Sequence, residues 1–323
     1  MRLARFNGGR IGVCLGDEIA DVTALCGVDP DEWPAVGPLR LIRDFAVLRP
    51  RIEAGLASAP RIALAQVRLE APVPWPNKVI AYPVNYHAHG REMQANYRAT
   101  NQGFFLKPSS SVSGPNDAVE LPQVPGREVH HESELGIVIG KQVRGLAREN
   151  WREAVFGYVC LLDMVVRGRE ERVFRKAYDT FCPTGPWIVT ADELPDPTAL
   201  DMKLWVNDEL RQSANTRDLV LDIPGMIATA SAVMTLYPGD IIATGTPEGV
   251  GPVGAGDTIR ITIEGIGEMR VPVVQGDQGV ERQPGGLGSA RRGRSVTVNS
   301  VVVGMGSFLS IVRRRASTCR MRR

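Results

Sequence analysis

Short apolar segments separated by Gly and Pro turns run through most of the chain and restrict what it can fold into. From residue 78 onward they predict strands at KVIAY, GFFLK, AVELP, ELGIVIG, GPWIVT, MKLWVN, DIIATG and TIRITIEG. We expect only two helices between them, at 148–156 and, after Pro224, at 225–237. Many strands with few intervening helices favour a packed or rolled β-sheet body over a doubly wound sheet.

The first 70 residues differ from this body and predict a small unit of their own. RIGVCLG and EIADV alternate like a hairpin around Gly16–Asp17, and a helix is expected near 37–66. The stretch APVPWPN, at 71–77, is typical of a linker. We therefore predict a small N-terminal α+β domain at 1–70 and a larger β-rich domain at 71–275.

Composition and charge exclude several classes of protein. No stretch approaches the roughly 20 apolar residues of a membrane helix, and the N-terminus lacks the apolar region of a signal peptide. The five cysteines show no CxxC spacing, which favours a cytoplasmic protein with buried, inert thiols, although a nucleophilic Cys182 is the alternative.

The charge is unevenly placed along the chain. Residues 276–323 hold ten Arg against Asp277 and Glu281, which leaves the rest of the chain acidic. We expect this Arg- and Gly-rich tail to be disordered and added to the domain, and we expect no nucleic-acid or membrane partner. A tail that binds nucleic acid is the alternative.

Two glutamates in HHESELGIVIG predict a metal site. Glu132 and Glu134 are two residues apart, so on a strand they share one face. Burying two like charges there is costly unless a cation lies between them. Asp163, which ends the apolar run GYVCLLD, is the best third oxygen ligand for a hard divalent cation. A pair of solvated surface glutamates is the alternative.

The segment NYHAHGREM, at 85–93, predicts a general base. His89 and Glu92 are three residues apart and would share a face of a helical turn. A carboxylate beside an imidazole orients it and raises its basicity, which suits activation of water. A surface loop with incidental histidines explains the same spacing.

Two further segments carry polar groups beside turns. Lys176, in FRKAYDTFCPTGPW, is suited to stabilising an oxyanion or enolate, although most lysines are simply solvated. In IIATGTPEGVG, the turn Thr244–Gly245–Thr246 offers N–H groups and a hydroxyl to a carboxylate. The turn lacks the Walker lysine and the GxGxxG spacing, which argues against nucleotide binding.

Together these segments resemble the fumarylacetoacetate hydrolase family, over about 3–274. The resemblance rests on NYHAH, KPSSSVSGPNDAVELP, HHESELGIVIG, the Asp163 strand, KAYDTFCPTGPWIVT, LVLDIP and LYPGDIIATGTPEGVGPV. It is closest to the branch of acylpyruvate hydrolases and 2-hydroxyhepta-2,4-diene-1,7-dioate isomerases. It implies an α+β, β-rich fold, a rolled mixed β-sandwich with a small N-terminal domain, and a homodimer.

The resemblance also implies a set of site residues and a reaction. Glu132, Glu134 and Asp163 would bind Mg²⁺ or Mn²⁺, and His89, Glu92 and Lys176 would be catalytic. Tyr86, Arg167, Gly245 and Thr246 would bind the substrate, a small keto acid. The implied reaction is metal-dependent hydrolysis of a C–C bond in a β-diketo or 2-keto acid, with an enolate and His-activated water.

The chain also departs from the family pattern. Many members carry Asn-Asp and then a Ser-Ala-Arg-Asp-like run at the third ligand, whereas here Leu162 precedes Asp163 and Gly168 follows Arg167. Two alternatives therefore stay open. One is a decarboxylase or isomerase of 2-hydroxydienoic or 2-oxo diacids in aromatic-compound catabolism, and the other is a silent small-molecule-binding relative.

Overall fold

The structure is a computed structural model that describes residues 1–278. The predicted tail at 276–323 therefore lies outside the described residues, apart from its first three positions. Within the described part, no helix is both long enough and apolar enough to cross a membrane.

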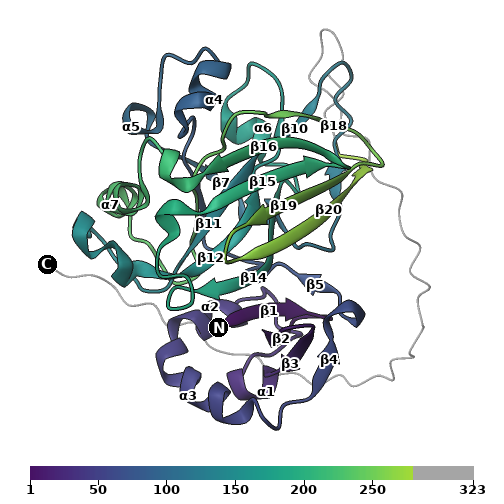
Figure 1. The fold of residues 1–323 in the computed structure, drawn as a ribbon, viewed down its shortest axis with the longest axis vertical. Helices are drawn as coiled ribbons and strands as arrows, with labels where there is room; N and C mark the ends of the chain where they lie inside the picture. Colours follow the sequence, from purple (N-terminus) through teal and green to yellow (C-terminus); the bar gives the residue numbers. More distant parts are fainter. Residues whose placement is uncertain (279–323) are drawn as a thin grey trace, which may run out of the picture. The chain divides into compact units, whose positions relative to one another are not determined.

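The N-terminal region pairs a small meander of strands with three helices, seen together in purple and blue in Figure 1. Its strands are β1 (Arg2–Phe6), β2 (Arg10–Leu15), β3 (Glu18–Asp21), β4 (Arg61–Ala63) and β5 (Leu69–Glu70), and its helices are α1 (Thr23–Cys26), α2 (Gly37–Arg43) and α3 (Phe45–Gly55). The predicted hairpin is confirmed, since Leu15 pairs with Glu18 across the turn.

The single helix predicted near 37–66 is wrong. The helical part is divided at Asp44, and residues 61–63 form β4 instead. Ile62 of β4 pairs with Ile19 of β3 and packs in the same small apolar cluster. Pairing at the open edge of β3 therefore outweighs the local helical pattern.

The strands between residues 71 and 278 belong to three sheets. The strands of the large sheet in this region are β6 (Val79–Ala81), β7 (Phe105–Lys107), β8 (Val112–Ser113), β11 (Ser133–Ile139), β12 (Val155–Leu162), β14 (Cys182–Thr190) and β17 (Ile241–Ala243). A five-stranded sheet contains β9 (Val119–Leu121), β15 (Asp201–Val206), β16 (Glu209–Asn215), β19 (Thr258–Ile263) and β20 (Gly267–Gln275). A three-stranded sheet contains β10 (Val129–His131), β13 (Val165–Val166) and β18 (Gly251–Val253).

The N-terminal strands extend the large sheet. Its main order is β4-β3-β2-β1-β14-β12-β11-β17-β6-β7, with β5 beside β1 and β8 beside β14. The junction is the antiparallel pairing of β1 with β14, while β17 and β6 run parallel. The described residues fall in one compact unit, and the division at residue 70 stays a prediction.

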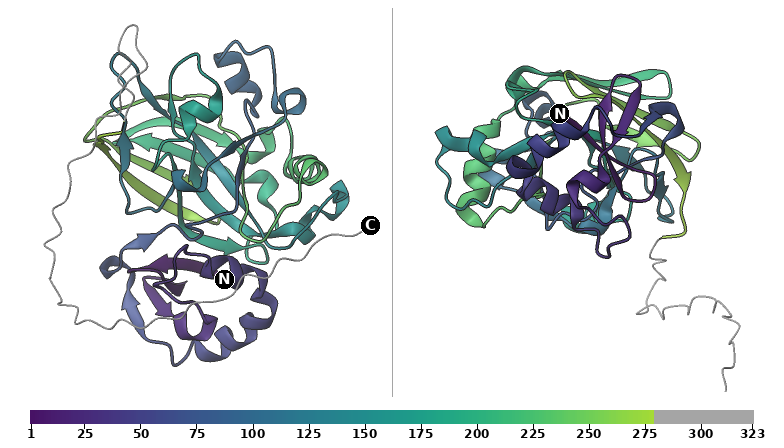
Figure 2. Two further views of the ribbon diagram at one scale, coloured as in Figure 1. Left: turned by 180° about the vertical axis from the view of Figure 1, so that it is seen from behind. Right: turned by 90° about the horizontal axis from the view of Figure 1, so that it is seen from below.

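The large sheet and the five-stranded sheet pack as layers around a shared core (Figures 1 and 2). Leu135 and Ile137 of β11 lie in one apolar cluster with Leu204 of β15 and Ile261 of β19. All seven residues of β11 are buried, because both faces of this strand are covered. These mixed, packed sheets confirm the predicted β-rich α+β fold class.

The helices of this region are short. They are α4 (His87–Glu92), α5 (Ala99–Gln102), α6 (Arg172–Lys176) and α7 (Ile223–Val233), with 3-10 turns η2 (Ser109–Ser111), η3 (Arg148–Ala154), η4 (Pro197–Ala199) and η5 (Thr216–Asp218). The 3-10 turn η1 (Leu64–Gln66) lies in the N-terminal region, between β4 and β5. The helix predicted after Pro224 is confirmed as α7, whose first turn is capped by the Asp222 side chain, which accepts from Gly225 N. The helix predicted at 148–156 is a 3-10 turn, because the chain enters β12 at Val155.

Candidate metal centre and active site

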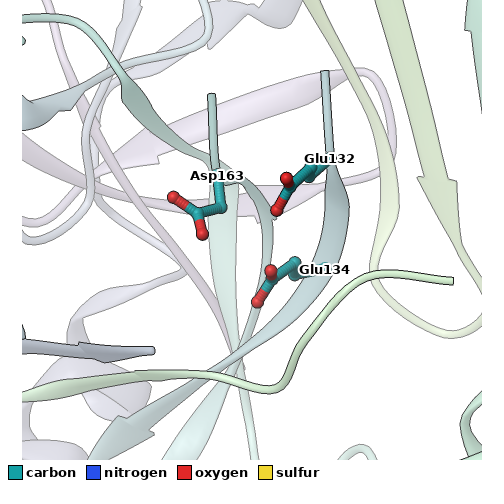
Figure 3. A group of neighbouring side chains, drawn as sticks. All are labelled: Glu132, Glu134 and Asp163. Carbon is teal, nitrogen blue, oxygen red and sulfur yellow. The ribbon is translucent and has the colours of Figure 1, made fainter. Parts of the chain in front are cut away.

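The register of β11 against β12 brings the three predicted metal ligands together. Ser133 pairs with Leu162, and the backbone N–H of Asp163 donates to the carbonyl of Glu132 at 2.9 Å. Asp163 therefore lies opposite Glu132 at the open end of the strand pair, and Glu134 follows two residues later on the same side. Figure 3 shows the three carboxylates grouped side by side.

These carboxylates form a buried, oxygen-rich cluster. One oxygen from each of Glu132, Glu134 and Asp163 lies within 4.8 Å of the others, and all three residues are buried. Burial and then the charge of Asp163 raise the pKa of Glu134 well above its usual value. An isolated cluster of this kind is unstable as three anions, so cations beside it are required.

Two lysines supply part of this positive charge. The Nζ of Lys176 lies 2.7 Å from Glu132 Oε2 and 2.5 Å from Asp163 Oδ2. The Nζ of Lys107 donates to Asp163 Oδ1 at 2.6 Å and to the carbonyls of Lys176 and Phe181. Burial opposes ionisation of both Lys176 and Asp163. The charges of Lys107 and then Lys176 outweigh burial at Asp163 and lower its pKa. The charges of Asp163, Glu132 and Glu134 outweigh burial at Lys176 and raise its pKa.

Lys107 was not identified from the sequence. It ends the apolar segment GFFLK, and its side chain is completely buried. A buried lysine at the end of a strand is costly unless it has an anionic partner, and that cost is the signal that predicts one. The sequence alone does not show that the partner is Asp163, because 56 positions separate the two residues.

The cluster fits a hard divalent cation. Such ions take carboxylate oxygens, and three carboxylates from one cluster suit Mg²⁺ or Mn²⁺. The backbone N–H of Gly245 donates to Glu134 Oε2 at 2.7 Å, which fixes this carboxylate and leaves its other oxygen without a hydrogen-bond partner among the described residues. The raised pKa of Glu134 shows the same need for an additional positive charge.

The predicted His89–Glu92 pair forms on α4. His89 Nδ1 and Glu92 Oε2 are 2.9 Å apart, and Glu92 Oε1 accepts from the backbone N–H of Gly249 at 2.9 Å. Both oxygens of Glu92 are thus held, and the imidazole is fixed through Nδ1. His89 is buried and lines the same cavity as the carboxylate cluster, so its Nε2 is the nitrogen left for a reacting group.

One cavity gathers most of the predicted site residues. Its wall includes His89, Glu132, Glu134, Asp163, Arg167, Lys176 and Thr246. Tyr86, Glu92 and Gly245 do not line it, although Glu92 is paired with His89, which does. Tyr86 is buried beside a separate hollow, and its hydroxyl has no hydrogen-bond partner within residues 1–278. The substrate-binding roles of Tyr86 and Gly245 stay predictions.

Gln212 on β16 is a second residue that sequence reasoning missed. Its Nε2 donates to Thr246 Oγ1 at 2.9 Å and to the Pro247 carbonyl at 3.0 Å. Its Oε1 accepts from the backbone N–H of Ser133 at 3.0 Å and lies 3.2 Å from His131 Nδ1. The buried amide therefore ties the Thr246 turn to the start of β11. No sequence motif marks it, because its partners come from two distant segments.

The cysteines do not belong to this chemistry. The four described cysteines are free and buried, and burial raises the pKa of Cys182 to about 12. A thiol with that pKa stays protonated near neutral pH and is a poor nucleophile. The expectation of inert, buried cysteines is confirmed for these residues, while Cys319 lies outside them.

Comparison with known proteins identifies the family. A family model described as "Fumarylacetoacetate (FAA) hydrolase C-terminal" matches residues 78–274. The chain belongs to the fumarylacetoacetate hydrolase family. The family resemblance predicted from the sequence is therefore confirmed.

Relatives within this family carry two kinds of activity. Maleylpyruvate hydrolase of Aquipseudomonas alcaligenes is 46% identical over 285 residues, which cover 84% of this chain and 99% of that protein. A crystal structure of maleylpyruvate hydrolase from Sphingobium sp. SYK-6, in complex with manganese(II) ion and pyruvate, is 72% identical with a TM-score of 0.80 and covers 86% of this chain and 100% of that one. The 2-hydroxyhepta-2,4-diene-1,7-dioate isomerase of Mycobacterium marinum is 32% identical, with a TM-score of 0.65 over 85% of this chain and 98% of that one.

The Gln212 network generates a prediction about stability. Replacing Gln212 by Glu removes the hydrogen bonds that Nε2 donates to Thr246 Oγ1 and to the carbonyls of Pro247 and Glu248, and it turns a carboxylate oxygen toward the Pro247 carbonyl. Because this group is buried, we expect the free energy of unfolding at pH 7 to fall by about 2 kcal/mol or more, measured by chemical denaturation. The control is Gln66→Glu, on the exposed surface, with an expected change within about 0.5 kcal/mol. Equal stabilities of the two variants would contradict the assigned network.

Proposed function

We propose that this chain is a divalent-metal-dependent hydrolase that cleaves a C–C bond of a β-diketo or 2-keto acid of the acylpyruvate type. The observation that carries the proposal is one cavity whose wall includes both the three-carboxylate cluster and His89, whose Nδ1 is paired with Glu92. Two relatives named maleylpyruvate hydrolase, 46% and 72% identical, support the same reaction class. The manganese and pyruvate in one of those structures support the metal and the keto-acid chemistry.

Glu132, Glu134 and Asp163 are the residues that would hold Mg²⁺ or Mn²⁺. When bound, such an ion supplies Lewis-acid polarisation of the carbonyl oxygens of a keto acid. The protein fixes the ligands beforehand. Gly245 N–H holds Glu134, and Lys107 holds one oxygen of Asp163, so little reorganisation is needed at the moment of reaction.

His89 is the general base in this proposal. With Nδ1 hydrogen-bonded to Glu92, its Nε2 accepts a proton from a water molecule that attacks the substrate carbonyl carbon. The buried, cationic Lys176 stabilises negative charge that develops on the substrate as the C–C bond breaks. Thr246 and Arg167 line the cavity, which supports the proposal that they bind the substrate carboxylate.

A second candidate reaction uses the same residues without an attacking water. The 2-hydroxyhepta-2,4-diene-1,7-dioate isomerase of M. marinum, 32% identical, favours it as the alternative. Isomerisation or decarboxylation of a 2-hydroxydienoic or 2-oxo diacid would give a spectral shift or CO₂ instead of two carbon fragments. A catalytically inactive relative that only binds small molecules would give no product. Binding alone does not require an oriented general base, so the His89–Glu92 pair argues against this alternative.

The proposal includes a cellular setting. We infer a cytoplasmic homodimer that acts in the catabolism of aromatic compounds. The four free, buried cysteines agree with a reducing compartment. The names of the relatives, which describe hydrolysis or isomerisation of unsaturated keto acids, agree with that kind of pathway.

A metal-dependent ultraviolet assay tests the proposed reaction. Protein stripped with EDTA is mixed with acylpyruvates and oxaloacetate, and Mg²⁺ or Mn²⁺ is then restored. We expect cleavage of acylpyruvates into pyruvate and a carboxylic acid only with metal, because the carboxylate cluster requires a cation to act. Cleavage that survives complete metal removal would contradict the proposal, and a spectral shift without fragments would support the isomerase alternative.

A pair of variants separates the metal ligands from the base. His89→Ala should lower kcat by about 10²–10⁴-fold and leave Mn²⁺ affinity nearly unchanged, because the base is not a ligand. Glu134→Gln should weaken Mn²⁺ binding at least about tenfold, because it removes a charged oxygen ligand. Calorimetric titration with Mn²⁺ and steady-state kinetics measure the two effects.

Matched controls for this pair are exposed residues of the same types. His87 lies on the same helix as His89 but outside the cavity, and Glu128 lies directly before β10, outside the cavity as well, so His87→Ala and Glu128→Gln are the controls. Both should retain activity and Mn²⁺ affinity. Loss of Mn²⁺ binding in His89→Ala, or normal binding in Glu134→Gln, would show that the roles are assigned wrongly.

A further inference from the structure

The cavity carries more positive charge than the metal centre needs. Besides Lys176 and the three carboxylates, Arg167, Arg172 and Arg175 line its wall. Within residues 1–278, none of these three guanidinium groups takes part in an ion pair. A bound divalent cation adds two more positive charges, so the carboxylates leave the arginines unneutralised.

The arginines lie close enough to disturb one another. Arg172 and Arg175 are three residues apart on α6, which places them on one face of the helix. Burial, and then the charge of Arg167, lower the pKa of Arg175. Arg172 adds to this lowering, whereas Glu132 and Glu170 oppose it. Holding like charges together costs free energy, and a bound anion would recover it.

The guanidinium groups are held in place before any ligand binds. Arg175 donates from Nε to the Glu170 carbonyl at 2.8 Å and from Nη1 to the Val166 carbonyl at 3.4 Å. Its Nη2 is then left to donate to a ligand. Arg172 lies over the ring of Tyr97, 4.8 Å from its centroid, and donates no hydrogen bond within residues 1–278. Two fixed, half-buried guanidinium groups with free N–H groups match the oxygens of a carboxylate.

We propose that Arg172 and Arg175 bind a second carboxylate, at the end of the substrate remote from the metal centre. The substrate class is then a dicarboxylic acylpyruvate rather than a monocarboxylic one. This inference rests on the proposed function, which places the keto-acid end of the substrate at Glu132, Glu134 and Asp163. The substrate spans the cavity from that cluster to α6.

An ordinary solvated basic surface explains the positions of Arg172 and Arg175 less well than a ligand-binding site does. Arg169, in the same segment, is exposed and lines no part of the cavity, as expected for a solvated arginine. Arg172 and Arg175 are half-buried and share the wall with the carboxylates. Burying a cation partly without a counter-ion costs free energy of desolvation, which an exposed cation avoids. The half-buried positions of Arg172 and Arg175 therefore favour the binding of an anionic ligand.

Binding of two matched 2-oxo acids tests the inference without relying on catalysis. The probes are 2-oxoadipate and 2-oxohexanoate, which differ only in a terminal carboxylate in place of a methyl group and lack the β-diketone that would be hydrolysed. Calorimetry with Mn²⁺-loaded protein should show 2-oxoadipate binding about tenfold to a hundredfold more tightly, as expected for charge-assisted hydrogen bonds. Added salt should reduce this preference.

Variants identify the residues responsible. Arg172→Gln and Arg175→Gln should each reduce the preference for 2-oxoadipate over 2-oxohexanoate at least about threefold, and the double variant should abolish it. The affinity for 2-oxohexanoate should stay unchanged in all three variants. Arg169→Gln removes the same charge from the same segment and should keep the full preference. In kinetics, the double variant should lose about tenfold or more in kcat/KM for maleylpyruvate and less than about threefold for acetylpyruvate.

The outcomes separate this inference from the proposed function. Equal affinities of the two 2-oxo acids for the unaltered protein, or a preference that survives in the double variant, would overturn the arginine site. Hydrolysis of both acylpyruvates alongside equal affinities would leave the proposed function standing without this inference. A clear binding preference without hydrolysis of either acylpyruvate would support the arginine site and contradict the proposed reaction.

Discussion

Repulsion among three buried carboxylates is the constraint on which the rest of the site depends. Glu132, Glu134 and Asp163 bring their oxygens within 4.8 Å of one another in a place that water hardly reaches. Lys107 and Lys176 offset part of this repulsion at Asp163, but the pKa of Glu134 remains raised. The lysines alone therefore do not balance the cluster, and a divalent cation does so with the ligand chemistry that it prefers.

The fold holds the three carboxylates together, despite their repulsion, because they lie on hydrogen-bonded strands. The antiparallel register of β11 and β12 sets Asp163 opposite Glu132, and both strands are buried between two apolar layers. Gly245 contributes through its conformation. Its φ of +96° is one that glycine adopts readily, and a Cβ there would lie 2.6 Å from Asn85 Cβ. This close approach lets its N–H reach Glu134.

The carboxylate cluster could be predicted from sequence because each of its members carried a local signal. Alternation on a strand placed Glu132 and Glu134 on one face, and Asp163 interrupted an apolar run where a lone charge is costly. The spacing of three residues between His89 and Glu92 likewise predicted that the two side chains would pair on one helical turn, as they do. Most of the strands were also predictable, since their apolar segments are separated by Gly and Pro turns.

Contacts between distant segments were not predictable. Lys107 and Gln212 find their partners through the register of strands far apart in the chain, and a single sequence does not encode that register locally. The same limit explains why residues 61–63 were assigned to a helix, since their strand forms only by pairing with β3. The arginines of α6 likewise carry no local signal in the sequence, and only the structure places them in the wall of the cavity.

The central claim is that the carboxylate cluster is a metal centre, and anomalous diffraction tests it most directly. Crystals grown with Mn²⁺ and measured at the manganese absorption edge should show one strong anomalous peak within bonding distance of Glu132, Glu134 and Asp163. The Lys176 ammonium should then have moved from its place between Glu132 and Asp163. A cluster without a peak, with Lys176 still bridging the two carboxylates, would contradict the account.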